Sequence, residues 1–167
     1  MKTLYLIRHA KSSWKDPSLR DFERPLNKRG KRDAPLMGQR LKDRGVVADA
    51  IISSTANRAL KTAKIIAGEL EFPLKKIASK KSVYLADVPT LIKVLRKISD
   101  KCGRAMLFGH NPGLTMLANF LSNEQVDNIP TCGVFCMEFE VESWKEVAQG
   151  SGKMVFFDYP KKYQQTV

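Results

Sequence analysis

The sequence lacks the residue patterns that mark several large classes of protein. Its 167 residues include three cysteines, an odd number without paired metal-ligand spacing, which argues against both a disulfide scaffold and a zinc module. We therefore expect Cys102, Cys132 and Cys136 to be reduced and to have packing roles at most, as in a cytoplasmic protein.

Long hydrophobic runs, internal repeats and low-complexity linkers are also missing. No apolar stretch approaches the roughly 20 residues that cross a bilayer. The apolar residues 4–7 end at Arg8, short of the ~7 to 15 residues of an export signal. A chain of 167 residues is near the usual size of one domain. We expect a soluble monomer with a single domain over residues 1–167 and no membrane partner.

Acidic residues are scarce in the first half of the chain. Residues 1–82 carry 20 Lys and Arg against 8 Asp and Glu, whereas residues 83–167 carry 9 of each, so the first half holds the whole net charge of +12. Such a field favours an anionic partner, which could be a phosphorylated molecule, an acidic protein surface or nucleic acid. For any single lysine, a solvated surface that keeps the protein soluble is an equally good explanation.

Strand-like and helix-like segments alternate along the chain, which is typical of α/β folds. Short β-branched or aromatic runs predict strands at 3–7, 50–53, 104–109, 133–141 and 153–159, with a weaker one at 82–85. Apolar periodicity predicts helices at 57–69, 89–98 and 113–121, and a further helix that ends near Arg44. Pro35 should kink that helix or delay its start. Together these elements predict a three-layer αβα sandwich with a mostly parallel central sheet.

The only two histidines each follow a predicted strand directly. His9 comes after 4–7 and Arg8, and His110 comes after 104–109. Because the carboxyl ends of parallel strands face a common crevice, the two imidazoles can approach each other across 100 residues of sequence. A third strand end, at residues 50–53, leads to Arg58 at the start of the next helix. The same crevice should therefore collect His9, His110, Arg8 and Arg58.

These four side chains suit phosphoryl transfer. Guanidinium groups are rigid, bidentate donors to phosphate oxygens, and helix N-termini add backbone donors. Nearby positive charge disfavours protonation of an imidazole and keeps its lone pair available as a nucleophile. Phosphoryl transfer needs mainly positioning and charge stabilisation, so we expect no metal and no cofactor.

Four segments of the chain resemble the signature motifs of one family. Residues 6–12 (LIRHAKS) resemble the Arg-His-Gly/Ala signature of the histidine phosphatase superfamily, which includes the cofactor-dependent phosphoglycerate mutases. Residues 24–30 (RPLNKRG), 53–63 (SSTANRALKTA) and 109–113 (GHNPG) resemble its Pro-Leu-Thr-x-x-Gly element, its arginine-bearing helix start and its second histidine motif. The motif RHAKSSW and the small size look closest to the branch named for bacterial phosphohistidine phosphatases.

The resemblance implies roles for individual residues. His9 would accept the phosphoryl group, and Arg8, Arg58 and His110 would contact the phosphate. The large insertions that roof the pocket of the mutases are missing, so no large cap domain is expected. Asn27 stands where the family often has Thr, which leaves a phosphate contact from that position open.

The acid that protonates the leaving group is not evident. Asp87 is a loose positional match and is the possible general acid; it is also a possible N-cap. An alkoxide leaving group needs protonation, whereas a phosphoramidate nitrogen can be protonated before it departs. A weak acid is thus tolerable if the substrate is phosphohistidine.

Residues around the expected pocket allow more than one reading. Ser12 could bind substrate, although residues 11–13 fit a solvated loop slightly better. Asn111 could orient the phosphate, or it could only cap its helix. Trp14 and Trp144 are expected to pack in the interior, although an exposed Trp14 beside the pocket could contact a partner.

Three functions remain open. The first is a phosphatase for phosphohistidine or another phosphoprotein, because an unroofed pocket admits a macromolecular surface. The second is a small-molecule phosphomonoesterase with the same chemistry. The third is a non-catalytic binder of anionic partners; nucleic acid is not expected, because no stacking motif or nucleic-acid fold is recognised. A mutase is disfavoured, since it needs an enclosed site to retain its intermediate.

Overall fold

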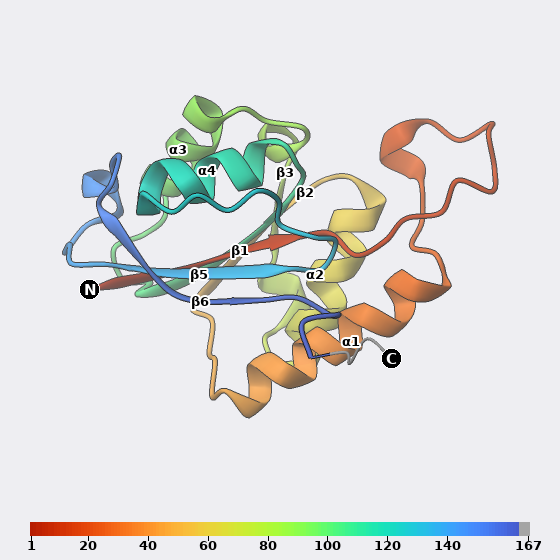
Figure 1. Ribbon diagram of the computed structural model, residues 1–167, viewed down its shortest axis with the longest axis horizontal. Helices are drawn as coiled ribbons and strands as arrows, with labels where there is room; N and C mark the ends of the chain where they lie inside the picture. Colours follow the sequence, from red (N-terminus) through yellow and green to blue (C-terminus); the bar gives the residue numbers. More distant parts are fainter. Residues whose placement is uncertain (164–167) are drawn as a thin grey trace.

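A six-stranded sheet lies between two pairs of helices in the computed structural model, which describes residues 1–163 (Figure 1). The strands are β1 (Lys2–Arg8), β2 (Ala50–Ser54), β3 (Ala78–Lys80), β4 (Arg104–Gly109), β5 (Val134–Phe139) and β6 (Gly152–Asp158). The helices are α1 (Lys28–Asp43), α2 (Asn57–Glu69), α3 (Val88–Arg96) and α4 (Gly113–Ser122). Short 3-10 turns are η1 (Asp21–Glu23), η2 (Leu74–Lys76), η3 (Lys81–Val83) and η4 (Trp144–Glu146).

The sheet is mostly parallel, as predicted. Its strand order is β3-β2-β4-β1-β5-β6, and the ladders β2–β3, β2–β4 and β1–β4 are parallel, whereas β5 runs antiparallel to both β1 and β6. Arg8 at the end of β1 pairs with Gly109 at the end of β4. The residues that follow these two strands are therefore neighbours, which positions the site described below.

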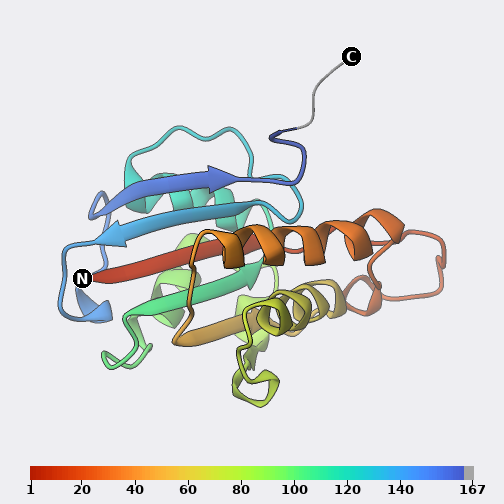
Figure 2. The ribbon, with the colours of Figure 1, turned by 90° about the horizontal axis from the view of Figure 1, so that it is seen from below.

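Helices cover both faces of the sheet and give the three predicted layers (Figures 1 and 2). On one face α1 and α2 bury an apolar stripe that includes Met37, Leu41 and Ile66; on the other, α3 and α4 bury Leu95 and Leu117. No large cap domain covers the carboxyl ends of the parallel strands in residues 1–163. None of the helices described is both long and apolar enough to cross a membrane.

The main elements lie where the sequence predicts them. Helix α2 has the predicted bounds, and the ends of the other main helices and strands differ by at most a few residues. The strand predicted at 82–85 is wrong: strand β3 ends at Lys80, and the chain then turns through η3. This turn buries Val83 against the core, 1 % exposed, and directs Tyr84 toward His110.

Helix α1 starts at Lys28 and runs through Pro35 without the predicted late start. Its first turn is capped by Asn27, whose Oδ1 accepts a hydrogen bond from Gly30 N at 2.9 Å. Burial of the helix against the sheet compensates for the hydrogen bond that Pro35 cannot donate. Asn27, at the family's usual threonine position, thus serves as a helix cap.

The structure agrees with the packing predictions for the cysteines and for one of the two tryptophans. All three cysteines are free, and Cys132 and Cys136 are buried. Trp144 is fully buried, as predicted. Trp14 is 74 % exposed, so its predicted interior position is wrong and the alternative of an exposed ring is correct.

Gly30 is required where α1 meets the segment that follows β1. A Cβ added to Gly30 would lie 2.2 Å from the carbonyl oxygen of Lys11, a backbone atom that also accepts a hydrogen bond from Asn27 N at 3.0 Å. Neither the backbone around Lys11 nor the start of α1 can move without displacing the other. The glycine therefore permits the close approach of two backbone segments.

We expect Gly30→Ala to lower the free energy of unfolding by about 1–3 kcal/mol, because overpacking forces the backbone to shift. The matched control is Gly68→Ala in α2, where nothing lies within 4 Å of the added Cβ. This control should be neutral or slightly stabilising, since alanine favours helix over glycine. Urea unfolding of both variants measures the difference, and equal stabilities would contradict the steric argument.

Candidate active site

Both histidines lie at the carboxyl edge of the parallel strands, where the sequence predicts them. His9 follows β1 and His110 follows β4, and the centroids of the two imidazole rings are 5.2 Å apart. His9 N donates to the carbonyl oxygen of Gly109 at 3.1 Å, which fixes the two strand ends relative to each other. Only 8 % of His9 and 5 % of His110 is exposed.

Hydrogen bonds determine which nitrogen of His9 has a free lone pair. Nδ1 lies 2.7 Å from the carbonyl oxygen of Ala10, an acceptor, so Nδ1 carries the proton and donates. Nε2 is then unprotonated and available. The position of Ala10 is fixed by α2, because Ala10 N donates to Thr62 Oγ1 at 3.0 Å while Thr62 donates to Arg58 O at 2.7 Å.

The same reasoning assigns the proton on His110. Its Nε2 lies 2.8 Å from Ser54 Oγ, and this oxygen accepts a hydrogen bond from Ala56 N at 3.2 Å. The Ser54 hydroxyl has its own proton to donate, and when it donates to Nε2 the imidazole proton lies on Nδ1. Nδ1 is buried and has no hydrogen-bond partner among the described residues. His110 thus presents an unpaired N–H donor.

Three arginines surround the imidazoles. Arg8 donates through Nη1 to Ile129 O at 3.0 Å. Arg58 donates through Nη1 to Asp21 O and through Nη2 to Asp21 Oδ2, both at 2.8 Å. Arg24, in the connection between η1 and α1, is 6 % exposed and lies 3.8 Å from the other oxygen of the Asp21 carboxylate. One exposed carboxylate therefore holds two of the three guanidiniums.

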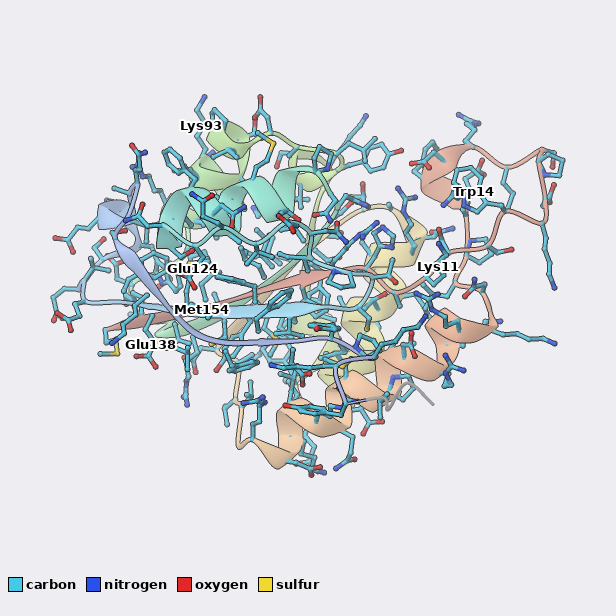
Figure 3. All side chains as sticks on the ribbon, in the orientation of Figure 1. Lys11, Trp14, Lys93, Glu124, Glu138 and Met154 are labelled. Atoms are coloured by element: carbon cyan, nitrogen blue, oxygen red, sulfur yellow. The ribbon has the colours of Figure 1, made fainter. Side chains whose placement is uncertain are left out.

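Arg24 is held by two further contacts. Its Nη2 donates a short hydrogen bond to Ser12 Oγ, and its guanidinium carbon lies 3.2 Å from the ring centroid of Trp14. Trp14 is on the loop between β1 and α1, beyond the sheet (Figure 3). The aromatic face and the serine oxygen together fix the plane of the guanidinium.

Buried donors without partners collect in this one place. The described residues contain five buried side-chain nitrogens that lack a hydrogen-bond partner, and four of them belong to Arg8, Arg24 and His110. A buried donor without a partner is costly, so such a group of donors indicates a site for an anion. A tetrahedral oxyanion would satisfy several of them at once.

Burial and positive charge keep both imidazoles neutral. Burial, followed by the charges of Arg58, Arg8 and Arg24, lowers the pKa of His9 to about 4, although the hydrogen bond to Ala10 O opposes the shift. Burial, the neighbouring His9 and then Arg58 lower the pKa of His110 to about 3. At neutral pH the site therefore combines an unprotonated nucleophile with a cluster of cationic donors.

Comparisons with known proteins agree with this chemistry. Residues 4–79 match the histidine phosphatase superfamily, branch 1. An uncharacterized chloroplastic protein of Arabidopsis thaliana is 35 % identical over 159 residues, which are 90 % of this chain and 72 % of that protein. The chain belongs to the histidine phosphatase superfamily.

Solved structures place this superfamily member in the SixA-like branch. The Agrobacterium tumefaciens protein described as phosphohistidine phosphatase SixA superimposes with a TM-score of 0.80 at 26 % identity, over 95 % of this chain and 98 % of that one. The SixA of Nakamurella multipartitia shares the fold, with a TM-score of 0.81 at 18 % identity over 95 % and 96 % of the two chains. The family and these neighbours indicate a phosphatase.

The predicted site residues of this histidine phosphatase differ in how well the structure agrees with the role expected for each. The structure brings Arg8, His9, Arg58 and His110 together, as expected. Ser12 is 5 % exposed, so the solvated loop favoured for it is wrong, and its hydroxyl contacts Arg24. The Ser12 hydroxyl therefore positions the Arg24 guanidinium, and any effect of Ser12 on substrate binding would act through that group.

The side chain of Asn111 has no free donor for a phosphate. Its Nδ2 donates to Asn128 Oδ1 at 2.8 Å and to Ile129 O at 2.9 Å, and its Oδ1 accepts from N and Oγ1 of Thr115. Both amide hydrogens are thereby used. The structure does not support a substrate contact from this side chain. The N-cap residue of α4 is Pro112 rather than Asn111, whose Oδ1 instead binds Thr115 in the first turn of the helix.

Asp87 is a poor candidate for the general acid. It caps α3, with Oδ1 accepting from Thr90 N at 3.0 Å, and it is exposed. Hydrogen bonds from Thr90 lower the pKa of this carboxyl, whereas an acid needs a raised pKa. Its role as an N-cap is confirmed, and the structure does not support the acid role.

Sequence reasoning missed three residues of the site: Arg24, Asp21 and Tyr84. Tyr84 donates its hydroxyl proton to Asp21 Oδ2 and places its ring edge-on to His110, with ring centroids 5.4 Å apart. Arg24 lies within a matched motif, so that motif could have pointed to it. Asp21 and Tyr84 are 63 residues apart, and no spacing pattern links them.

The depressed histidine pKa values predict a loss of stability in acid. In the unfolded chain both imidazoles titrate near pH 6.5, whereas in the fold they titrate near 4 and 3, so between these values the unfolded state binds more protons. The free energy of unfolding should therefore fall as pH decreases from about 7.5 to 5, by on the order of 2 kcal/mol per imidazole.

Urea unfolding at several pH values tests this prediction. The double variant His9→Asn/His110→Asn lacks both groups and should show a much shallower decline above pH 5, where few carboxylates titrate. An equal decline in both proteins would show that other groups cause it.

Proposed function

We propose that this phosphatase removes the phosphoryl group from phosphohistidine on a protein, by way of a phosphohistidine intermediate on His9. The observation that carries the proposal is the arrangement of unpartnered donors on Arg8, Arg24 and His110 around an imidazole whose Nε2 lone pair is free. Because no large cap domain covers the site within residues 1–163, a protein surface can approach it.

In the first step, His9 Nε2 attacks phosphorus. A new P–Nε2 bond forms while the bond from phosphorus to the imidazole nitrogen of the substrate breaks, and the electron pair stays on that nitrogen. The substrate imidazole, protonated beforehand by solvent, leaves as a neutral group. Arg8, Arg24, Arg58 and His110 stabilise the charge on the phosphoryl oxygens as it passes between the two nitrogens.

In the second step, water attacks phosphorus on the phosphorylated His9. The P–Nε2 bond breaks, its electron pair returns to Nε2, and inorganic phosphate leaves with the oxygen of the water. The surplus proton goes to solvent. The Nδ1–H···O bond from His9 to Ala10 keeps the ring in one orientation and tautomer through both steps. We expect both steps to proceed without a metal or an organic cofactor.

The carboxyl groups of Asp21 and Asp87 favour phosphohistidine over phosphate esters. Asp87 and Asp21 both have a lowered pKa, Asp21 because Tyr84 and Arg58 bind its charged form. Ionised carboxylates cannot protonate an alkoxide leaving group. A phosphoramidate can be protonated on its leaving nitrogen before the bond breaks, so it does not need such an acid. A SixA structure of the same fold, solved with tungstate, is described as a protein histidine phosphatase.

A substrate panel tests the proposal. We expect kcat/KM for a phosphohistidine-bearing protein to exceed that for sugar phosphates, nucleotides and phosphoserine peptides by at least about 100-fold, the usual size of a missing general-acid contribution. Comparable turnover of sugar phosphates would favour the small-molecule phosphomonoesterase instead. Binding of phosphate or phosphoprotein without turnover would favour a non-catalytic role. The monomeric state and the cytoplasmic location remain predictions.

A further inference from the structure

Two adjoining hollows form a groove beside the active site. One, of about 510 Å³, lies along the start of α1, and the other, of about 310 Å³, lies between the starts of α1 and α2; they share Pro25, Leu26 and Lys31. Leu60 completes the apolar floor. We call this surface the lysine groove, after the exposed lysines that flank the floor: Lys15, Lys28, Lys31, Lys61 and Lys64.

The lysine groove is lined by the same chain segments that carry the arginines of the active site. Three residues that line it are sequence neighbours of site residues: Ser13 follows Ser12, Pro25 follows Arg24, and Asn57 precedes Arg58. Asn57 also links the start of α2 to η1, since its Nδ2 donates a hydrogen bond to Glu23 O at 2.9 Å. A chain that enters the site from this side would therefore cross the groove. The segments involved are the β1–α1 loop and the first turns of α1 and α2 (Figure 1).

The charge of the groove is not neutralised by neighbouring residues. None of its five lysines forms a salt bridge within residues 1–163. Nearby carboxylates pair with arginines instead: Asp21 with Arg58 and Arg24, Glu23 with Arg20, and the buried Asp33 with Arg29 and Arg32. Clustered cations without internal partners attract an anionic surface and speed its association.

We infer that the lysine groove docks an acidic segment of the phosphoprotein substrate, which rests on the proposed function. The floor selects protein over nucleic acid, because Pro25, Leu26 and Leu60 suit an aliphatic side chain and no aromatic ring lines either hollow for a base to stack on. Carboxylates on either side of that aliphatic residue would meet the lysines. Docking here would concentrate the substrate beside His9.

Direct binding of a synthetic probe tests the inference without any turnover. The probe is a fluorescein-labelled peptide of about ten Glu and Asp residues interrupted by two leucines, measured by anisotropy at low salt. The groove variant is Lys31→Glu/Lys61→Glu/Lys64→Glu. The control, Lys97→Glu/Lys101→Glu/Lys145→Glu, makes the same change in net charge at exposed positions at the opposite end of the parallel strands.

We expect the groove variant to bind the peptide at least about 10-fold more weakly, since three favourable contacts become repulsive, and the control to stay within about twofold. Equal losses in both variants would assign the binding to the general charge of the protein and overturn the inference. So would absence of peptide binding, or tighter binding of an oligothymidylate of equal charge.

A kinetic comparison separates this inference from the proposed function. A phosphohistidine peptide with an acidic tract should have a KM at least about 10-fold lower than the same peptide with a neutral tract, with similar kcat, and the groove variant should lose this difference. Turnover that ignores the tract overturns the docking site and leaves the phosphatase intact. Absence of turnover, with peptide binding confined to the groove, overturns the proposed function and supports the docking site.

Discussion

His9→Ala should lower kcat toward a small phosphoramidate by at least about 10⁴-fold, because the substitution removes the imidazole whose Nε2 lone pair is left free by the bond from Nδ1 to Ala10 O. The neighbouring imidazole cannot replace it. His110 Nε2 faces Ser54 Oγ at 2.8 Å, and when this hydroxyl donates to Nε2 the imidazole proton lies on Nδ1. Steady-state kinetics with phosphate release as the readout measures the loss.

Labelling identifies the intermediate in the same experiment. Incubation with a radiolabelled phosphoramidate should phosphorylate the protein in an acid-labile, base-stable form that is absent from His9→Ala. His110→Ala is the matched control, because it removes an imidazole 5.2 Å away but keeps the acceptor, so label should still form and should turn over slowly. Label that survives in His9→Ala would transfer the nucleophile role to another residue and end the proposed mechanism.

The elements that position the site could be predicted because their signals are local. Helix α2 carries apolar residues at spacings of three and four, and β1 and β4 are short apolar runs that end at a histidine. Parallel strands then bring the two histidines to the same edge of the sheet. The predictions that fail concern segments whose conformation is set by tertiary contacts. Residues 82–85 have strand-like composition, but Val83 packs beneath Gly109, which turns the chain.

The roles of individual side chains are harder to predict than the positions of the helices and strands. Asp87 and Asn111 lie close in sequence to the elements that build the site, yet both carry out capping or anchoring that uses their polar atoms completely. Ser12 is predicted to lie in a solvated loop, and loops are usually exposed. It is buried because Arg24, twelve residues later, folds back onto it. Contacts of this kind depend on loop geometry, which residue spacing does not encode.

Arg24→Ala should lower kcat/KM by about 10²- to 10³-fold, the usual effect of removing one donor from a site that stabilises an oxyanion. Two of its nitrogens, Nε and Nη1, are buried without a hydrogen-bond partner among the described residues. Nη1 lies 3.8 Å from Asp21 Oδ1, too far for a hydrogen bond, so both nitrogens have hydrogens available for phosphoryl oxygens. Arg24→Lys should not restore activity, because a lysine cannot donate to Ser12 and the oxyanion in the same fixed plane. The affinity for inorganic phosphate, measured by competitive inhibition, should fall together with kcat/KM.

The contacts of Arg24 allow a graded version of this test. Ser12→Ala and Trp14→Ala each remove one support of the guanidinium and leave its charge in place, so each should cause a smaller loss than Arg24→Ala. Because all three act through one group, either variant combined with Arg24→Ala should add little to its effect. Arg20→Ala is the control: it removes an exposed arginine of the same loop, whose ion partner is Glu23, and should leave turnover unchanged. If kcat/KM of Arg24→Ala also stayed within about threefold of that of the native protein, with Tm unaltered, the guanidinium of Arg24 would have no part in phosphate binding.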